Sequence, residues 1–427
     1  MNGSSKPTSR SALFKYNALL WALSLPLAIF TVGQALRRGG WRYALQRLGW
    51  AHPHFTQRPI WLHAASVGEV IAALPLLERL QARDLTTPIL LTTTTPTGAA
   101  IAVARVPSRV THAYLPIDWR GAVRRFVHRT QPRCALVMET ELWPNLYRRC
   151  KTTDIPLVVV NGRLSARTLR AGTWMRSVYR TTLADVDAVL ARSETDRNAF
   201  VELGAPMARV SVVGNIKFSV GANGKEVSAI HLGRRYLLAA STHHDEELQL
   251  AVLWRHLAHG EHLLVIAPRH PQRAKNILEQ LAALQISVAV RSQGDAVTAQ
   301  TEVYLADTLG ELPALISGAD LVFMGGSLVH VGGHNILEPA RAGKAILFGP
   351  YMRNFADESR ALLEADAAVQ VRDVAALGEH ITRLLNDPQQ CDELGKRARV
   401  LLLANANIAD RYVEAIVTLC KLNNQAA

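Results

Sequence analysis

The sequence predicts an α/β protein with two doubly wound domains facing across a cleft, preceded by an N-terminal membrane-anchor helix. Short apolar runs alternate with amphipathic helical segments from residue 59 onward, which is typical of parallel sheets covered by helices. The alternation stops in a polar stretch at residues 218 to 231 and then restarts, so two sheets are expected. A run of twenty uncharged residues comes before both of them.

The length and composition agree with two domains. The chain has 427 residues, 49% of them hydrophobic, which is enough to bury two cores. Its four cysteines are far apart and include no C-x-x-C pair, so neither a disulfide framework nor a cysteine-rich zinc site is expected. This cysteine usage is typical of a protein in a reducing compartment.

The positive charge is concentrated in the first half of the chain. Residues 1 to 215 hold 28 Lys and Arg against 12 Asp and Glu, whereas residues 216 to 427 hold 20 against 23. Clusters of basic residues between positions 120 and 151 indicate an anionic partner. Nucleic acid would match the charge, but no aromatic interleaving or nucleic-acid motif accompanies it, so a phosphate-bearing membrane surface is favoured.

The uncharged run extends from residue 17 to residue 36, with Lys and Arg on both sides. Twenty apolar residues are about enough to cross a bilayer, whereas the apolar core of a cleaved signal peptide is usually about 7 to 15 residues long. Ser24, Pro26 and Gln34 dilute the run, so an anchor lying in the membrane interface stays open. The basic cluster after the run favours a membrane anchor with the remainder of the chain in the cytosol.

Thirteen apolar runs are the predicted strands. Those of the first sheet are residues 60 to 64, 89 to 93, 110 to 115, 135 to 139, 157 to 161, 188 to 192 and 210 to 213. Those of the second are residues 236 to 240, 262 to 267, 287 to 290, 303 to 305, 321 to 324 and 345 to 348. The predicted domains are therefore an anchor at 1–40, a first domain at 41–220 and a second at 221–427. The helical stretch from 388 to 422 is long enough to return to the first domain.

The first candidate catalyst is Glu69, on the turn after the first predicted strand. Residues 61 to 70 run from an apolar strand through Ser66 and Gly68 into a helical pattern. Ligands of open α/β sheets bind beyond the carboxyl ends of the strands, where a lone acid is well placed for chemistry. A different interpretation makes Ser66 the N-cap of the helix and Glu69 its capping-box partner, and the spacing fits that equally well.

Two more candidates follow predicted strands of the first domain. Glu139 ends the strand at 135 to 139, so it should lie at the same sheet edge as Glu69. Glu141 is more readily explained as an acid at the start of the next helix. Lys217 follows the last strand of this domain, just before the linker, where a cation is suited to neutralise a leaving phosphate.

Three loops of the second domain are suited to bind an anion. Arg269 closes a strand with a planar guanidinium that matches a phosphate or a carboxylate. Glycine pairs at 325 to 326 and 332 to 333 allow backbone N–H groups to approach an anion near a helix start. Residues 307 to 311 add a third loop on the same side. None of these loops is a GxGxxG or a Walker motif, which disfavours the common dinucleotide and P-loop sites.

Two segments imitate metal sites, but a metal is not expected at either. His243 and His244 are adjacent, so they cannot share a helix face, and the residues around them are suited to begin a helix. Asp185 and Asp187 form a D-x-D pattern, but they precede their strand and so lie at the wrong edge of the sheet.

Taken together, six segments resemble the Kdo transferases of lipopolysaccharide synthesis, Kdo being 3-deoxy-D-manno-octulosonic acid. These segments are HAASVGE, METELWPN, GNIKF, APRHP, DTLGEL and GGHNILEPA. The resemblance extends from about residue 40 to the C-terminal helix, and six motifs in order are far more specific than any one of them. It implies two Rossmann-like domains in a GT-B fold and no cofactor. It also implies inverting, metal-independent transfer of Kdo from CMP-Kdo to lipid IVA at the cytosolic face of the inner membrane.

The resemblance also implies roles for individual residues. Glu69 resembles the general base, and Glu139 and Lys217 resemble groups that support the transition state. The residues that resemble CMP contacts are Pro268, Arg269, Leu309, Gly310, Glu311, Asn335, Ile336, Leu337 and Glu338. An acceptor hydroxyl has a high pKa and so needs a base, and the departing CMP is an anion that basic groups and a helix N-terminus can hold. The alternatives are a GT-B enzyme that uses a UDP-sugar and a membrane-bound binding module without activity.

Overall fold

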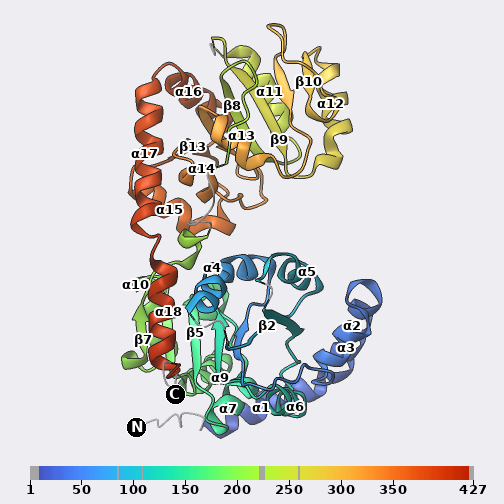
Figure 1. Cartoon of the computed structure of the whole chain (residues 1–427), viewed down its shortest axis with the longest axis vertical. Helices are drawn as coiled ribbons and strands as arrows, with labels where there is room; N and C mark the ends of the chain where they lie inside the picture. The colour runs from blue at the N-terminus through green and yellow to red at the C-terminus, as the bar shows by residue number, and fades with distance from the viewer. Residues whose placement is uncertain (1–8, 84–85, 108, 221–226, 258–259, 423–427) are drawn as a thin grey trace, which may run out of the picture. The chain divides into compact units, whose positions relative to one another are not determined.

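The computed structural model describes residues 9–83, 86–107, 109–220, 227–257 and 260–422 (Figure 1). The chain divides into two compact units. The first is Met1–Ala222 together with Ala406–Ala427, and the second is Asn223–Asn405. Each unit contains one parallel sheet, and the two sheets confirm the predicted α/β class.

The sheet of the first unit has its first strand near the middle, in the order β3-β2-β1-β4-β5-β6-β7. Most of these strands are apolar and buried on both faces, as expected when helices cover both sides of a parallel sheet. Trp61, Phe126, Tyr147 and Phe200 are the largest side chains of its core. The strands are β1 (Ile60–His63), β2 (Ile89–Thr93), β3 (Val110–Tyr114), β4 (Cys134–Met138), β5 (Leu157–Gly162), β6 (Ala188–Ala191) and β7 (Val210–Val212).

Helices of the first unit begin at recognisable sequence signals. The Thr95 hydroxyl accepts the backbone N–H of Gly98 at the start of α5, and Ser193 accepts that of Asp196 at the start of α10. Proline is the first residue of both α5 and α7, where its missing N–H costs nothing. The helices are α4 (Val67–Arg83), α5 (Pro96–Arg105), α6 (Arg120–Thr130), α7 (Pro144–Thr152), α8 (Ala166–Leu169), α9 (Thr173–Ala184), α10 (Glu194–Leu203), η2 (Met207–Arg209) and η3 (Ile216–Ser219).

The N-terminal segment forms several short helices instead of one. They are α1 (Ser9–Ala22), α2 (Ser24–Gln34), η1 (Ala35–Gly39) and α3 (Gly40–Arg47). The helical axis bends by 56° between residues 22 and 24. Within the described residues no single helix is long and apolar enough to cross a membrane, although this bent pair meets the test of length and composition.

Helix α1 is attached to the first unit by packing and by polar contacts. It packs against α9. The Tyr16 hydroxyl donates to the buried carboxylate of Asp118 at 2.9 Å, and the Asn145 amide donates to the side-chain oxygen of Asn17 at 2.9 Å. Asp118 also accepts the backbone N–H groups that open α7, both at 2.9 Å. The predicted anchor is therefore partly built into the domain that follows it.

The sheet of the second unit has the order β10-β11-β9-β8-β12-β13-β14. Its strands are β8 (Tyr236–Thr242), β9 (Leu263–Pro268), β10 (Val288–Val290), β11 (Val303–Leu305), β12 (Leu321–Met324), β13 (Ala345–Phe348) and β14 (Val369–Gln370). All thirteen predicted strands are present, with ends that differ by at most two residues. The two-residue strand β14 was not predicted, because so short a segment has no measurable periodicity.

Helices cover the second sheet as well. They are α11 (Glu246–His256), η4 (Pro271–Arg273), α12 (Ala274–Ala283), η5 (Arg291–Gln293), α13 (Leu312–Gly318), α14 (Leu337–Arg341), η6 (Arg353–Phe355), α15 (Ala356–Glu364), α16 (Val374–Leu385) and α17 (Pro388–Ala404).

The C-terminal stretch is two helices where the pattern predicted a continuous one. Helix α17 belongs to the second unit, and α18 (Ile408–Leu419) belongs to the first, where it packs on α4 and η3. The buried Tyr412 donates its hydroxyl to the backbone oxygen of Gly214 at 2.8 Å.

Candidate active site

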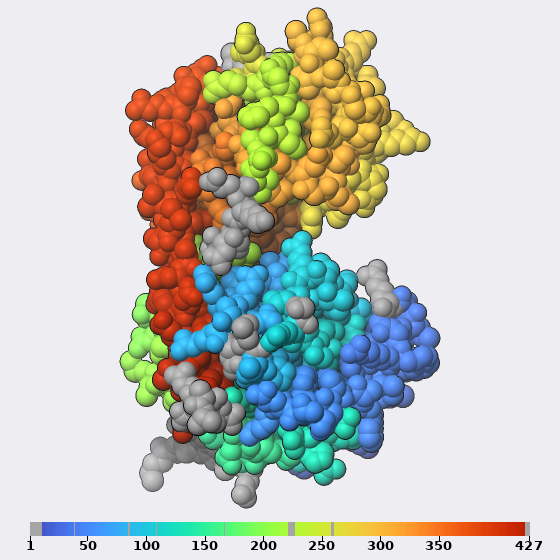
Figure 2. Space-filling model, in the orientation of Figure 1, coloured from blue at the N-terminus to red at the C-terminus, as the bar shows by residue number. Residues whose placement is uncertain are grey.

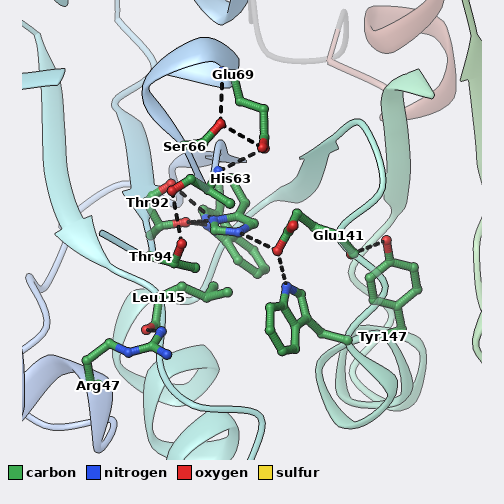
Figure 3. Close-up of polar contacts among 12 residues, drawn as sticks. Arg47, His63, Ser66, Glu69, Thr92, Thr94, Leu115, Glu141 and Tyr147 are labelled. Carbon is green, nitrogen blue, oxygen red and sulfur yellow. Dashed lines mark hydrogen bonds and ion pairs between the residues drawn. The ribbon is translucent and has the colours of Figure 1, made fainter. Parts of the chain in front are cut away.

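The turn after β1 holds Glu69 by three hydrogen bonds (Figure 3). The Ala65 N–H donates to one carboxylate oxygen at 2.9 Å, and the Ser66 hydroxyl donates to the other at 3.0 Å. The Glu69 N–H in turn donates to the Ser66 hydroxyl oxygen at 3.3 Å. The last two contacts are those of a capping arrangement, so Glu69 does help to begin α4. Its side chain stays partly exposed, which leaves it accessible for chemistry.

The environment of Glu69 favours its protonated form. Burial, followed by repulsion from the Glu139 and Glu141 carboxylates, raises its pKa to about 8, although the Ala65 N–H and the Ser66 hydroxyl oppose the rise. The effects that raise the pKa of Glu69 are therefore stronger than those of the groups that lower it. A carboxyl with such a pKa is suited to exchange a proton near neutral pH.

Glu139 directly follows β4, which is paired with β1, so both acids lie at one edge of the sheet. It is buried, with 7% of its surface exposed, and it forms an ion pair with Arg163 at 2.8 Å. Its backbone is in the left-handed region, with a φ of 53°, which a non-glycine residue adopts at a cost of about 1–3 kcal/mol. Such strain is found most often at functional sites.

Glu141 lies against His63, at the carboxyl end of β1. Its carboxylate is 3.8 Å from Nε2 of the buried imidazole and accepts the indole N–H of Trp143 at 3.0 Å. Nδ1 of His63 is 3.0 Å from both oxygens of Thr92, and Figure 3 shows the ring between Thr92 and Glu141. Glu141 is thus a fixed part of this edge, and its charge acts on Glu69.

Lys217 lies on η3, beside α4, the helix that Glu69 helps to begin. The side-chain oxygen of Asn161 accepts the Ile216 N–H at 3.1 Å and so fixes η3 to the end of β5. Asn161 also has a positive φ, 54°. Lys217, Glu69 and Glu139 therefore belong to connected elements of the same unit.

In the second unit, the loops after β8, β9, β11 and β12 line one edge of the sheet. Pro268 ends β9, and the next residue, Arg269, is exposed and donates its backbone N–H to the backbone oxygen of Thr242 at 3.0 Å. Its guanidinium is therefore accessible to a ligand at the centre of this edge.

Glu311, after β11, is held within the second unit. Arg291 binds its carboxylate at two points, 2.7 and 3.1 Å, and the Thr308 hydroxyl also donates to it. The Arg291 and Thr308 bonds lower the pKa of Glu311 to about 2. Gly310 has a φ of 90° and the Leu309 side chain is 82% exposed, so this loop presents backbone and an apolar side chain to solvent.

The segment from Asn335 to Glu338 begins the short helix α14. The Asn335 amide donates to Glu338 at 2.9 Å, and its oxygen accepts the Leu337 N–H at 3.2 Å. Ile336 and Leu337 are buried, whereas Asn335 and Glu338 are partly exposed. The two polar side chains are therefore the ones that a ligand can contact.

Residues that the sequence did not single out complete both edges. Arg163 is the ion-pair partner of Glu139, and the His63 imidazole lies 3.8 Å from the Glu141 carboxylate. In the second unit, the fully buried Glu246 accepts N–H groups from His243, Gly326, Ser327 and Leu328, at 2.7 to 3.1 Å. Polar residues at the ends of predicted strands, such as Asn161 and Arg163, are the sequence feature that could have identified these additional residues.

The segments that imitate metal sites have other partners. Asp185 pairs with Arg148 and Asp187 with Lys151, both at 3.2 Å, at the amino end of β6. His244 is exposed and pairs with Asp245. Among the residues that the structure describes, no group of three or more His, Cys, Asp or Glu is arranged to hold a metal ion.

Comparison with known proteins decides the family. Residues 42–220 match the family described as 3-deoxy-D-manno-octulosonic-acid transferase (kdotransferase). The 3-deoxy-D-manno-octulosonic acid transferase of Bordetella pertussis is 34% identical over 92% of this chain and 96% of its own length. The enzyme of the same name from Haemophilus influenzae is 33% identical, over 84% of this chain and 86% of its own length.

This chain belongs to the Kdo transferase family. It is therefore a glycosyltransferase, and its activity is Kdo transfer in lipopolysaccharide core biosynthesis. The predicted family is confirmed.

Solved structures with low sequence identity share the fold. A putative UDP-N-acetylglucosamine 2-epimerase from Listeria monocytogenes has a TM-score of 0.60 at 14% identity, covering 87% of this chain and 98% of its own. The UDP-GlcNAc 2-epimerase from Neisseria meningitidis has a TM-score of 0.57 at 14% identity, covering 84% and 100%. These proteins support the GT-B type of architecture for the Kdo transferase chain and nothing about its substrates.

Proposed function

We propose that this Kdo transferase moves Kdo from CMP-Kdo to lipid IVA, with inversion at the anomeric carbon and without a metal ion. The observation that carries the mechanism is Glu69, a partly exposed carboxyl at a sheet edge whose pKa is raised to about 8. The family membership supports the transferred sugar. The excess of basic residues in the first half supports a phosphorylated lipid as the acceptor.

Glu69 acts as the general base in this mechanism. It removes the proton of the acceptor hydroxyl while that oxygen attacks the anomeric carbon, and the bond from that carbon to the CMP phosphate breaks with its electron pair on the phosphate. Proton transfer of this kind contributes typically 10²- to 10⁴-fold to a rate. Glu139 and Lys217 support the transition state in this proposal, and Arg163 fixes the Glu139 carboxylate at 2.8 Å.

The second unit binds the departing CMP. Arg269 offers a guanidinium that matches a phosphate, and the loops of residues 309 to 311 and 335 to 338 supply further contacts. Exposed Leu309 is suited to contact a base, and partly exposed Glu338 is suited to accept hydrogen bonds from ribose hydroxyls. Protein groups then stabilise the leaving anion, and no cofactor is required.

The N-terminal helices attach the protein to the cytoplasmic side of the inner membrane in this proposal. Large apolar side chains of this segment are exposed, among them Phe14, Trp21, Leu25, Ile29, Phe30, Leu36 and Trp41. Figure 2 shows the segment, in dark blue, on the surface of the first unit. Because α1 packs on α9 and bonds to Asp118 through Tyr16, an interfacial anchor accounts for the structure better than a spanning helix.

Transfer is tested by incubating the protein with CMP-Kdo and lipid IVA and measuring the lipid by mass spectrometry. The expected product is the acceptor plus Kdo, with CMP released in proportion, and the mass also gives the number of sugars added. Incubation with UDP-sugars is the control for the donor. If the lipid mass stays unchanged while CMP-Kdo is intact, the proposed reaction is wrong.

Membrane attachment is tested by changing exposed side chains, since deletion of residues 1 to 36 would remove Tyr16, one of the hydrogen-bond partners of buried Asp118. The variant Trp21→Glu/Phe30→Glu should lose most of its binding to anionic phospholipid vesicles and keep its thermal midpoint. The control is Val400→Glu, at a position of α17 that is 64% exposed. If wild type, the double variant and Val400→Glu bind vesicles equally well, the N-terminal helices do not make the membrane contact.

A further inference from the structure

Three histidines and an arginine lie close together in the second unit, at the sheet edge formed by the loops after β8, β9, β11 and β12. β8 lies between β9 and β12, so the sheet order reverses there, and this is where α/β sheets bind ligands. His243 follows β8, Arg269 and His270 follow β9, and His334 precedes the segment proposed to contact CMP. The imidazoles have no role in the mechanism described so far.

The His243 and His334 rings form a pair. They are stacked, with ring centroids 5.0 Å apart and planes 3° apart, and their Nε2 atoms are 2.7 Å from one another. At that distance one nitrogen must donate its proton and the other accept it. The ring of His270 lies edge-on to His243 with centroids 5.7 Å apart.

The loop after β12 leaves room for this pair, because it has a glycine beside the two rings. Gly326 has a φ of 65°, and a Cβ there would lie 3.0 Å from His334 and 3.3 Å from His243. Its carbonyl accepts the Gly333 N–H at 2.7 Å, which ties the loop to the segment that carries His334. The buried Glu246 carboxylate accepts the N–H groups of both His243 and Gly326, at 2.9 and 2.7 Å.

The charges around the pair are mainly positive. Arg269 and His270 face both rings, and Arg273 faces His243. Two carboxylates lie near His243: that of Glu247 is held by Arg273 at 2.8 and 3.2 Å, and that of the buried Glu246 accepts the His243 backbone N–H at 2.9 Å. Both rings are only partly buried, so a ligand can reach them. The surroundings therefore favour an anion against the two imidazoles.

We propose that His243 and His334 bind the carboxylate of the sugar acid that is transferred and so select an acidic sugar. The inference rests on the proposed donor, CMP-Kdo. Its two anionic groups, the phosphate and the sugar carboxylate, lie close together in the molecule. Its phosphate is assigned to Arg269 and the neighbouring loops, so the carboxylate must lie close by. The imidazole pair is the adjacent group that can donate hydrogen bonds to it.

Binding of a carboxylate to this pair favours proton uptake. Burial, together with neighbouring His270, lowers the pKa of His243, and burial together with His243 lowers that of His334 to about 4. Both rings are then neutral at pH 7 before binding. An anion stabilises the charged imidazolium and raises the pKa, so the complex holds more protons than the free protein and its affinity increases as the pH falls.

The test compares CMP-Kdo with CMP, which has the phosphate but no sugar carboxylate. Calorimetric titration without lipid acceptor is carried out between pH 6 and 8, in buffers of different ionisation enthalpy. Wild type should bind CMP-Kdo, a phosphodiester that does not titrate in this range, more tightly at pH 6 than at pH 8, with proton uptake. CMP is a monoester whose phosphate itself titrates at about pH 6, so the two ligands are compared at pH 8 and the pH dependence is compared between wild type and the histidine variants with CMP-Kdo. His334→Ala and His243→Ala should bind CMP-Kdo about tenfold more weakly and leave CMP nearly unchanged.

Two further variants separate recognition from a structural role. His334→Gln keeps a neutral donor, so it should retain part of the preference for CMP-Kdo and lose the proton uptake. His244→Ala, at the neighbouring exposed histidine, should behave as wild type. Thermal midpoints show whether each variant is folded.

The outcomes distinguish this inference from the proposed function. If wild type binds neither CMP nor CMP-Kdo, the proposed donor is wrong and the inference falls with it. If wild type binds both, but folded His243 and His334 variants keep the full preference for CMP-Kdo, only the inference is wrong. An equal loss for CMP and CMP-Kdo would mean that the pair binds the phosphate, which also overturns the assignment.

Discussion

The binding edges of the two units share a topology and differ in charge. In each sheet the first strand of the unit lies between its second strand and a later one, and the polar residues follow these central strands. The edge of the first unit gathers Glu69, Glu139 and Glu141, whereas that of the second gathers Arg269 and histidines. One architecture thus carries an acidic edge, proposed to accept a proton, and a basic edge, proposed to hold an anion, and the two differ in their loop residues.

Both edges also contain strain at a central strand. Glu139 after β4 has a φ of 53°, and Ser241 near the end of β8 has a φ of 56°. Left-handed backbone at a non-glycine residue persists only where the surrounding contacts fix it. Glu139 is fixed by Arg163, and the loop after Ser241 is fixed by Glu246. The common feature is therefore a turn held rigid by a buried ionic or hydrogen-bonded group.

The largest expected effect separates chemistry on the first edge from binding on the second. Glu69→Gln should lower the single-turnover rate about 10²- to 10⁴-fold, because Gln cannot accept the proton, and should leave CMP affinity unchanged. Glu78→Gln, on the exposed face of the same helix, is the control. A normal rate, or a loss explained by a lower thermal midpoint, would leave Glu69 with the capping role alone.

The second expected effect concerns Arg269. Arg269→Ala should weaken CMP binding about 10- to 100-fold, because hydrogen bonds to charged groups contribute about 1.5–3 kcal/mol. Arg269→Lys should keep more CMP affinity than Arg269→Ala but less than wild type, since an ammonium does not offer two parallel N–H groups. Titration calorimetry measures the affinity, with exposed Arg372→Ala as the control. If Arg269→Ala binds CMP as tightly as wild type, Arg269 does not bind the phosphate.

A smaller effect is expected on the pH dependence. The base must be deprotonated, so kcat/KM should rise with pH and level off above the Glu69 pKa of about 8. Glu141→Gln removes a negative charge that raises this pKa, so the rise should shift to lower pH and the rate at pH 7 should increase several-fold at most. The profile of Glu78→Gln should match wild type. If Glu141→Gln leaves the pH profile of kcat/KM unchanged, the increase with pH is not caused by deprotonation of Glu69.

The smallest expected effect is that of metal removal. If Arg269 and backbone N–H groups of the second unit neutralise the leaving phosphate, EDTA should leave the initial rate unchanged. The measurement is the rate of CMP release before and after dialysis against EDTA. A loss that a divalent ion restores would assign the anion-holding role to a metal, with the His243 and His334 nitrogens as the first ligands to examine.

The sequence predicted the strands well and the side-chain pairings poorly. Buried parallel strands are short runs of apolar residues, so the pattern located all thirteen of them and, with them, the turns that carry Glu69, Glu139 and Arg269. The pairing of Glu139 with Arg163 and the stack of His243 on His334 join residues from different strands or loops. Hydrophobic periodicity contains no information about such partners.

The N-terminal segment shows a different limit. Its uncharged run was predicted as an anchor separate from the domains, because hydropathy measures the average of a segment. The structure attaches the start of this segment to the first unit through Tyr16, directly before the run, and Asn17, its first residue, and an average over the segment conceals such polar contacts. The remaining apolar face, around Trp21 and Phe30, is the part available for a membrane.

The return of α18 to the first unit has a consequence for the order of folding during synthesis. Domains usually fold from the N-terminus as the ribosome releases them. Here Tyr412, fully buried against Gly214, follows it by 198 residues, which take on the order of ten seconds or more to synthesise. The second unit lies wholly within that interval and can complete its core first. The first unit, although begun earlier, keeps the surface of α4 and η3 uncovered until α18 emerges.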